Sequence, residues 1–284
     1  MLVLLVLSLI VLATFFGLQP LLHKAIFAAL FLCIILCLSD ILPFTMLGRK
    51  QVKSFNKNDP HISLNMLVGN VLMDNDNYRA MEDKVKIYNP DIVFLVETDS
   101  TWAEKLSSLE TLYPFRYLLP LEDYNGMLFY SKFPILNVQE RYLVQDHIPS
   151  LTIDLDVGAH DPVRFYGVHP RPPRPEDDTA DLDKELMFIA HEAGHHLAPT
   201  LVTGDLNDVG WSSTTKKFLR VSGLGDPRRG RGLYNSYNAK NPLVRWPLDH
   251  LFQSQHFVLK KMQRLDASGS DHFPLLIELA LLTD

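Results

Sequence analysis

The chain has 284 residues, 47% of them hydrophobic, and a formal net charge of −6. This size and composition fit a globular protein with an additional apolar segment. Lys24 and Asp40 are the only charged residues before residue 48 and they cancel, so residues 48 to 284 carry the whole net charge. A net acidic domain argues against a broad nucleic-acid-binding face. Both cysteines, Cys33 and Cys37, lie in an apolar run, which excludes a disulfide in the remainder of the chain.

The hydrophobic excess is concentrated in two runs at the start of the chain. Residues 1–18 contain no charged side chain, and a second run extends from about 21 to 47. Each run is close to the roughly 17–25 residues that span hydrocarbon. A cleaved signal peptide is disfavoured because a basic n-region and a small-residue cleavage site are both missing. We therefore predict a membrane anchor at residues 1–47, made of two transmembrane helices or of one helix and a re-entrant segment, in a multi-pass protein of the cell membrane.

The charges beside these runs leave the side of the membrane open. Arg49, Lys50 and Lys53 follow the second run and favour a cytoplasmic domain, whereas Lys24 between the two runs favours the opposite side. Residues 48–60 are polar and without periodicity, which predicts a linker before a domain at residues 61–284.

Strands and helices alternate after the linker. Apolar and polar residues alternate from Ile62 to Val68, which predicts a half-buried strand that ends near Asn70. Asn77 precedes a helical pattern, and the apolar run from Asp91 to Glu97 is typical of a central strand with a carboxylate at its end. A further helix is expected around Trp102, Leu106 and Leu109, and another at residues 179–197. Strands are expected at 126–130, 135–144, 151–157, 163–168, 200–204, 243–252, 257–265 and 275–282.

This pattern predicts an α/β (α+β) fold, a four-layered α/β/β/α sandwich of two mostly antiparallel sheets. Catalytic groups are expected where strand ends from both sheets meet. The segment T-L-V-T-G-D-L-N at 200–207 illustrates this, because Asp205 and Asn207 follow a buried strand and leave its end on the same side. A carboxylate and a carboxamide held together suit a hard cation, an attacking water and a phosphate oxygen. The alternative is a polar turn, since Asp, Asn and Gly are common in turns.

Polar residues occupy many of the predicted strand ends and form an ordered set. Its members are Asn70, Glu97, His169, Asp205, Asn207, Asp249 and Ser270-Asp271-His272. With G-D-L-N at 204–207, S-D-H-F-P at 270–274 and P-D-I-V-F-L-V-E at 90–97, the set resembles the endonuclease/exonuclease/phosphatase superfamily. These are metal-dependent phosphodiesterases with a deoxyribonuclease-like four-layered sandwich. The resemblance covers residues 60–282, and the leading hydrophobic segment looks like the membrane-attached bacterial branch.

The resemblance implies a role for each of these positions. Glu97 would be the main ligand of Mg²⁺ or Mn²⁺, with Asn70 beside it and Asp271 in the metal's shell. Asp205 would position the attacking water, and Asn207 would support that water and a phosphate oxygen. Such a metal prefers oxygen ligands and neutralises charge on the phosphoryl group.

The histidines receive roles from the same resemblance. His272 would act as a base or contact the phosphate, oriented by Asp249, and His169 would face the phosphate or the leaving oxygen. Arg171 and Arg174 lie close to His169 in the sequence, where they either meet a substrate phosphate or solvate a proline-rich loop. One departure is Val96, since relatives often have glutamine before the glutamate, and this puts the substrate preference in doubt.

A rival motif is His191-Glu192-Ala193-Gly194-His195, which matches the H-E-x-x-H signature of zinc metalloproteases. On a helix, both histidines fall nearly opposite the apolar stripe and therefore point towards solvent. A surface helix is the preferred interpretation. A basic run at Arg228, Arg229 and Arg231 is interpreted as a solvated turn.

The sequence thus predicts a membrane-anchored, Mg²⁺-dependent hydrolase of phosphate esters, most simply a phosphodiesterase. Its expected partners are the lipid bilayer and a nucleic-acid, phospholipid or small phosphoester substrate, and no protein partner is inferred. The alternatives are a non-catalytic binding domain on the same scaffold and the zinc protease. Retention of the complete acidic and histidine set argues against a non-catalytic domain.

Overall fold

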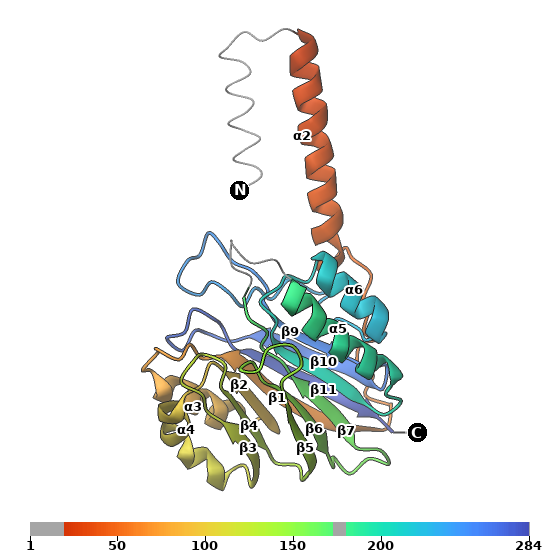
Figure 1. Cartoon of the computed structure of the whole chain (residues 1–284). Helices are drawn as coiled ribbons and strands as arrows, with labels where there is room; N and C mark the ends of the chain where they lie inside the picture. The colour runs from red at the N-terminus through yellow and green to blue at the C-terminus, as the bar shows by residue number, and fades with distance from the viewer. Residues whose placement is uncertain (1–19, 173–179, 284) are drawn as a thin grey trace.

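The computed structural model describes residues 20–172 and 180–283. Two sheets lie face to face, with α3 (Tyr78–Tyr88) and α4 (Ser100–Lys105) outside one sheet and α5 (Ala180–His195) and α6 (Ser213–Ser222) outside the other (Figure 1). Helix α2 (Pro20–Ile41) projects away from this sandwich. The predicted four-layered α/β/β/α sandwich is confirmed.

Each sheet is mixed but mostly antiparallel. The first has the order β10-β11-β1-β2-β4-β3 and the second β5-β6-β7-β8-β9. Among the described strands, β1 pairs in parallel with β2 and β7 with β8, while the other neighbours are antiparallel. The strands are β1 (His61–Asn70), β2 (Ile92–Val96), β3 (Phe115–Leu119), β4 (Met127–Ser131), β5 (Ile135–Arg141), β6 (Ser150–Leu155), β7 (Val163–Gly167), β8 (Thr200–Asp205), β9 (Asp249–Gln253), β10 (Phe257–Arg264) and β11 (Leu275–Leu282).

Strand alternation assigns residues to three layers of core. In β1, Leu64, Met66 and Val68 pack between the sheets, as their alternation predicts, while Leu67 points outwards against Met81 of α3 and its neighbours. A third cluster joins the outer face of the second sheet to α5 and α6. Burying both faces of the central strands fixes their register, since a shift of one residue would exchange the two faces.

The sequence patterns missed some elements. β3 and α6 were not predicted, and the helix expected around Trp102 is divided into α4 and a 3-10 helix, η2 (Ser107–Thr111). The strand expected from Leu243 begins only at Asp249. Pro247 explains the late start, because proline cannot donate a hydrogen bond to a sheet.

Helix α2 begins the described part of the chain. The segment Lys24–Phe44 has a mean hydropathy of 2.7 and is long enough to cross a membrane. The first of the two predicted membrane helices lies outside the described residues, so a multi-pass arrangement has no support from the described part of the chain. Pro43 disfavours helix at the residue before it, and α2 gives way to a 3-10 turn, η1 (Leu42–Phe44), whose Phe44 is only 1% exposed.

The predicted linker at residues 48–60 lies against the first sheet. The Leu259 amide donates to the carbonyl of Lys53 at 3.0 Å, and the Phe55 amide donates to the carbonyl of Leu259 at 3.0 Å. Val52 is buried with the core between the sheets. The segment therefore follows the outer edge of β10 as part of the folded domain.

Candidate active site

The topology brings strand ends from both sheets to one edge. Asn70 pairs in register with Val96, so Glu97 follows directly beside it. In the second sheet the parallel β7 and β8 bring His169 and Asp205 to the same edge, because parallel strands end on the same side. Asp205 is paired with Asp249 of β9.

Asn70 joins the two sheets through its amide. Its Nδ2 donates to Oε1 of Glu97 at 2.6 Å and to Oδ2 of Asp205 at 3.0 Å. Its Oδ1 accepts from the backbone amide of Leu72 at 3.0 Å. Both oxygen and nitrogen are thus engaged, and Asn70 holds the two carboxylates together.

Glu97 lies in an unusual backbone conformation, with φ of 57°. A non-glycine residue in this left-handed region costs of order 1–3 kcal/mol, and such residues cluster at functional sites. Burial raises the pKa of the Glu97 carboxyl, whereas the nearby His169 charge and the Asn70 hydrogen bond oppose that shift. The fold therefore holds a desolvated carboxyl at the shared edge.

His272 connects Asp249 with Asp205. Its Nδ1 lies 2.7 Å from Oδ2 of Asp249, and its Nε2 lies 3.5 Å from Oδ2 of Asp205. Burial opposes the charged imidazolium, but the two carboxylates outweigh it and raise the pKa of His272 to about 10. Burial also favours the protonated form of Asp205, yet His272 and His169 hold the pKa of this carboxyl below its usual range. The site thus favours an ionised Asp205 beside a protonated imidazole.

His169 is a buried side chain of this site that lacks a hydrogen-bond partner. Its side chain is 5% exposed, and neither ring nitrogen makes a hydrogen bond. Its Nε2 lies 3.8 Å from Oε1 of Glu97 and 3.9 Å from Oδ2 of Asp205. Buried polar groups are ordinarily hydrogen-bonded, so this orphaned imidazole points to a ligand that completes the site.

Two groups of side chains among the described residues could hold a metal ion. Glu97, His169 and Asp205 form one, and Asp205, Asp249 and His272 form the other, with the ligand atoms of each group within 4.8 Å of one another. Asp205 belongs to both groups. The donor set of carboxylates and imidazole fits a divalent cation.

The structure defines the roles of the remaining predicted site residues less closely. The Asn207 amide donates to Oδ1 of Asp205 at 2.9 Å, and its Nδ2 donates to the carbonyl of Pro170 at 3.0 Å. Asp271 precedes His272 and is half-buried, but it belongs to neither group of possible metal ligands. Arg171 is half-buried next to Pro170, and Arg174 lies outside the described residues. The roles of these side chains remain predictions.

The H-E-x-x-H segment forms part of the solvent-exposed face of α5, as predicted. His191 and His195 are exposed, and Glu192 forms a bidentate pair with Arg141. In the part of the chain that the structure describes, neither histidine belongs to a group that could hold a metal. The zinc-site interpretation therefore has no structural support.

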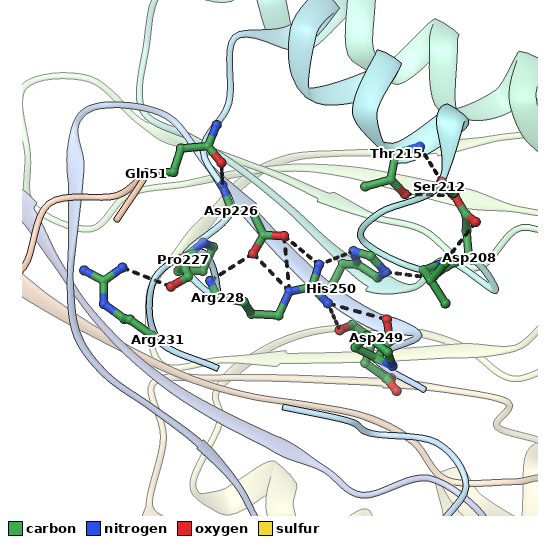
Figure 2. A network of polar contacts seen from close by, with 12 residues as sticks. Gln51, Asp208, Ser212, Thr215, Asp226, Pro227, Arg228, Arg231, Asp249 and His250 are labelled. Carbon is green, nitrogen blue, oxygen red and sulfur yellow. Dashed lines mark hydrogen bonds and ion pairs between the residues drawn. The ribbon is translucent and has the colours of Figure 1, made fainter. Parts of the chain in front are cut away.

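A buried charge network was missed by the sequence reasoning. Arg228, predicted to lie in a solvated turn, is 0% exposed and pairs with Asp226, which is also 0% exposed (Figure 2). That prediction is wrong for Arg228, because the residue forms hydrogen bonds with Asp226 and with His250 of β9 instead of with water. The only local signal was the acid two residues before the arginine.

The fold and the cluster around Asp205 define a class of protein. It is a four-layered sandwich with carboxylates and imidazoles at the edge shared by its two sheets. The model of the endonuclease/exonuclease/phosphatase family matches residues 63–272. The chain belongs to the endonuclease/exonuclease/phosphatase family, whose members are generally metal-dependent hydrolases of phosphoesters.

Solved structures show the same fold at low sequence identity. A humanized D. rerio TDP2 carrying 14 mutations aligns with a TM-score of 0.62 and 13% identity, over 76% of this chain and 98% of that one. D. rerio TDP2 complexed with a single-strand DNA product gives 0.61 and 14%, with the same two coverages of 76% and 98%. An endonuclease/exonuclease/phosphatase family protein from Bacteroides thetaiotaomicron gives 0.61 and 17%, over 79% of this chain and all of that one. No curated protein sequence matched this chain.

Proposed function

We propose that this protein is a membrane-anchored phosphodiesterase that depends on Mg²⁺ or Mn²⁺. The observation that carries the proposal is the buried cluster around Asp205, in which Asn70, His169 and His272 approach one carboxylate from three segments. A purely structural cluster would satisfy its own polar groups, whereas His169 is left without a hydrogen bond.

Glu97 would be the main ligand of the cation, next to Asp205. Both carboxylates lie at the cluster that Asn70 bridges, and hard divalent ions prefer such oxygen ligands. When bound, a divalent cation supplies charge neutralisation for the phosphoryl oxygens. The hydrogen bonds of Asn70 argue against a direct role as a metal ligand, because its amide nitrogen faces both carboxylates.

The chain's own residues would bind the phosphate and prepare the water. Asp205 is buried, and its lowered pKa favours the carboxylate, which would accept a hydrogen bond from an attacking water and orient it. His272 is held by Asp249 and would contact the phosphoryl oxygens as an imidazolium. One of the unengaged ring nitrogens of His169 would contact the same phosphate, and Asn207 would support the water.

Helix α2 supports membrane attachment, and the loop between α6 and β9 supports a substrate near the membrane. This loop lies on the same side of the domain as the base of α2 (Figure 1). Leu243 and Trp246, which belong to it, are 92% and 42% exposed. The loop also contacts the site, because the Ala239 amide donates to the carbonyl of Asp271. Phospholipid headgroups are therefore a substrate class to test beside the single-stranded DNA that is bound as product in D. rerio TDP2.

The full-length protein in detergent micelles tests the proposal. Its activity on single-stranded DNA, RNA, phospholipids, a small phosphodiester and a peptide is measured before and after EDTA, and again after adding Mg²⁺, Mn²⁺ or Zn²⁺. Phosphodiester hydrolysis that is lost with EDTA and restored by Mg²⁺ or Mn²⁺ is expected. Peptide cleavage restored only by Zn²⁺, or no hydrolysis with any metal, would contradict it.

A further inference from the structure

The segment that carries Asn207 is supported by a buried network outside the metal cluster. We call residues 206–211, which join β8 to α6, the Asn207 loop. The network starts at Asp226, whose carboxylate accepts from Nη2 of Arg228 at 2.7 Å and from Nε at 3.0 Å. Arg228 Nη2 also lies 2.7 Å from Nδ1 of His250, and His250 Nε2 lies 2.8 Å from the carbonyl of Asp208 (Figure 2).

Hydrogen-bond chemistry gives this network one direction. An arginine guanidinium can only donate, so Nδ1 of His250 must accept from it and Nε2 must carry the proton that is donated to Asp208. His250 is therefore a neutral imidazole of a single tautomer. Its 0% exposure agrees, since no water can replace either partner.

The side chain of Asp208 connects this network to the first turn of α6. Its Oδ2 accepts from the hydroxyl of Thr215 at 2.8 Å and from the hydroxyl of Ser212. Ser212 is the N-cap of α6 and accepts from the Thr215 amide at 2.9 Å. Asp208, next to Asn207, is thus bonded to β9 through its backbone carbonyl and to the start of α6 through its side chain.

Phe44, at the base of α2, closes the other side of the loop. A Cβ at Gly210 would lie 2.9 Å from Cζ of Phe44 and 3.0 Å from Nη2 of Arg228, so a glycine is required where the loop passes between them. The Phe44 ring meets Trp211 edge-on at 6.0 Å between centroids. The carbonyl of Pro43 also accepts from the Gly230 amide at 2.8 Å, which fixes the turn that carries Phe44.

We propose that Arg228 and His250 are positioning residues that hold Asn207 at the site, and that Phe44 at the base of α2 completes this support. The proposal rests on the role assigned above to Asn207 in the reaction. Asn207 has φ of 51°, a left-handed conformation that asparagine adopts more readily than most residues. Asn207 itself is bonded to Asp205 and Pro170, and the buried network and Phe44 hold the residues that follow it in the loop. The end of the membrane segment is thereby a structural component of the site.

Two substitutions of His250 separate a hydrogen-bonding role from simple packing. His250→Gln keeps a donor for the Asp208 carbonyl, whereas His250→Phe keeps the ring volume and removes both hydrogen bonds. Hydrogen exchange of a peptide covering residues 203–212 in the full-length protein reports the order of the loop without any substrate. We expect about tenfold faster exchange in the phenylalanine variant and near-normal exchange in the glutamine variant.

Turnover should follow the same order. A displacement of about 1 Å in a positioned group can lower the rate by about 10²-fold, so His250→Phe should lower kcat by about 10–100-fold. His250→Gln should remain within about threefold of the wild type, and the affinity for Mn²⁺ should be unchanged in both, because Glu97 is untouched. Gln253→Ala is the control, since Gln253 is a buried polar residue of the same strand that bonds the Phe257 carbonyl.

Phe44→Ala tests the second support and remains informative if His250→Phe fails to fold. It should speed exchange of the same peptide and lower kcat, whereas Phe31→Ala, on the 65%-exposed ring of Phe31 in α2, should do neither. Unchanged exchange in both His250→Phe and Phe44→Ala would overturn the proposal. A wild type without any phosphodiesterase activity would overturn the proposed function instead, and the exchange results would still decide the role of the network.

Discussion

Removal of His272 and Asp249, singly and together, is the most direct test of the candidate site. The two side chains share a 2.7 Å hydrogen bond, and Asp249 is completely buried. A positioned acid or base contributes roughly 10²–10⁴-fold to turnover, which corresponds to about 3–5 kcal/mol in the activation barrier. His272→Ala should therefore lower kcat by about that factor.

The size of the Asp249 effect follows from the hydrogen bond. A bond to a charged group contributes about 1.5–3 kcal/mol, so Asp249→Asn should lower kcat by about 10–150-fold while keeping the shape of the site. Asp249→Ala should cost nearly as much as His272→Ala, because the imidazole then loses its orientation as well. Groups that act as a unit are not additive, and the double alanine variant should be little slower than the slower single one.

The assay is steady-state turnover of the best phosphodiester with saturating Mg²⁺, with thermal unfolding of each variant as a check on folding. His256→Ala is the matched control, because His256 bonds the Ser254 hydroxyl at 2.9 Å outside the cluster. Losses that multiply in the double variant would refute the pairing of His272 with Asp249. Near-normal turnover of His272→Ala would refute its assignment to the site.

Three further predictions concern the metal, the anchor and a buried acid. Glu97→Ala should weaken Mn²⁺ binding measured by calorimetry far more than His191→Ala, and equal affinities would contradict the metal assignment. Full-length protein should stay with membranes through a carbonate wash because of α2, and its release would mean that this helix is not inserted. Burial raises the pKa of Glu185 from 4.5 to about 8, so the folded state holds its proton more tightly and wild-type stability falls as the pH rises between these values. Glu185→Gln should therefore raise the free energy of unfolding in urea by about 2–4 kcal/mol at pH 9 and by little at pH 4. The exposed Glu104→Gln should change it at neither pH. An equal gain for Glu185→Gln at both pH values would contradict burial of the ionised carboxyl as the reason.

Local patterns were sufficient for the residues at strand ends. Asn70 ends a strand with strong apolar alternation and Glu97 follows a strand with a continuous apolar run, and both lie where the sequence predicted them. Their meeting with Asp205 could be expected from the family's motifs, but its detail could not. That Asn70 donates to both carboxylates depends on how two sheets pack, which strand patterns do not specify.

The support of the site could not be predicted for the same reason. Arg228 lies in a basic run, and such runs are ordinarily solvated, yet its partner His250 is 22 residues further along the chain. Phe44 lies in an apolar run that resembles membrane-spanning sequence, and nothing in that run distinguishes a ring that packs on the domain. Helix α6 has few apolar positions and depends on its Ser212 cap and on contacts of Phe218 with Phe252.

The pairing of residues 53–55 with β10 has a consequence for association between molecules. An uncovered edge strand offers unpaired amides and carbonyls to any other strand, which promotes aggregation. Here both the amide and the carbonyl of Leu259 are already bonded, to Lys53 and Phe55. A chain shortened to begin after Phe55 would lose this cover together with Phe44 and Val52, and its free edge would favour intermolecular sheet formation. The segment between the helix and the domain thus also covers the β10 edge at Leu259 against pairing with a strand of another molecule.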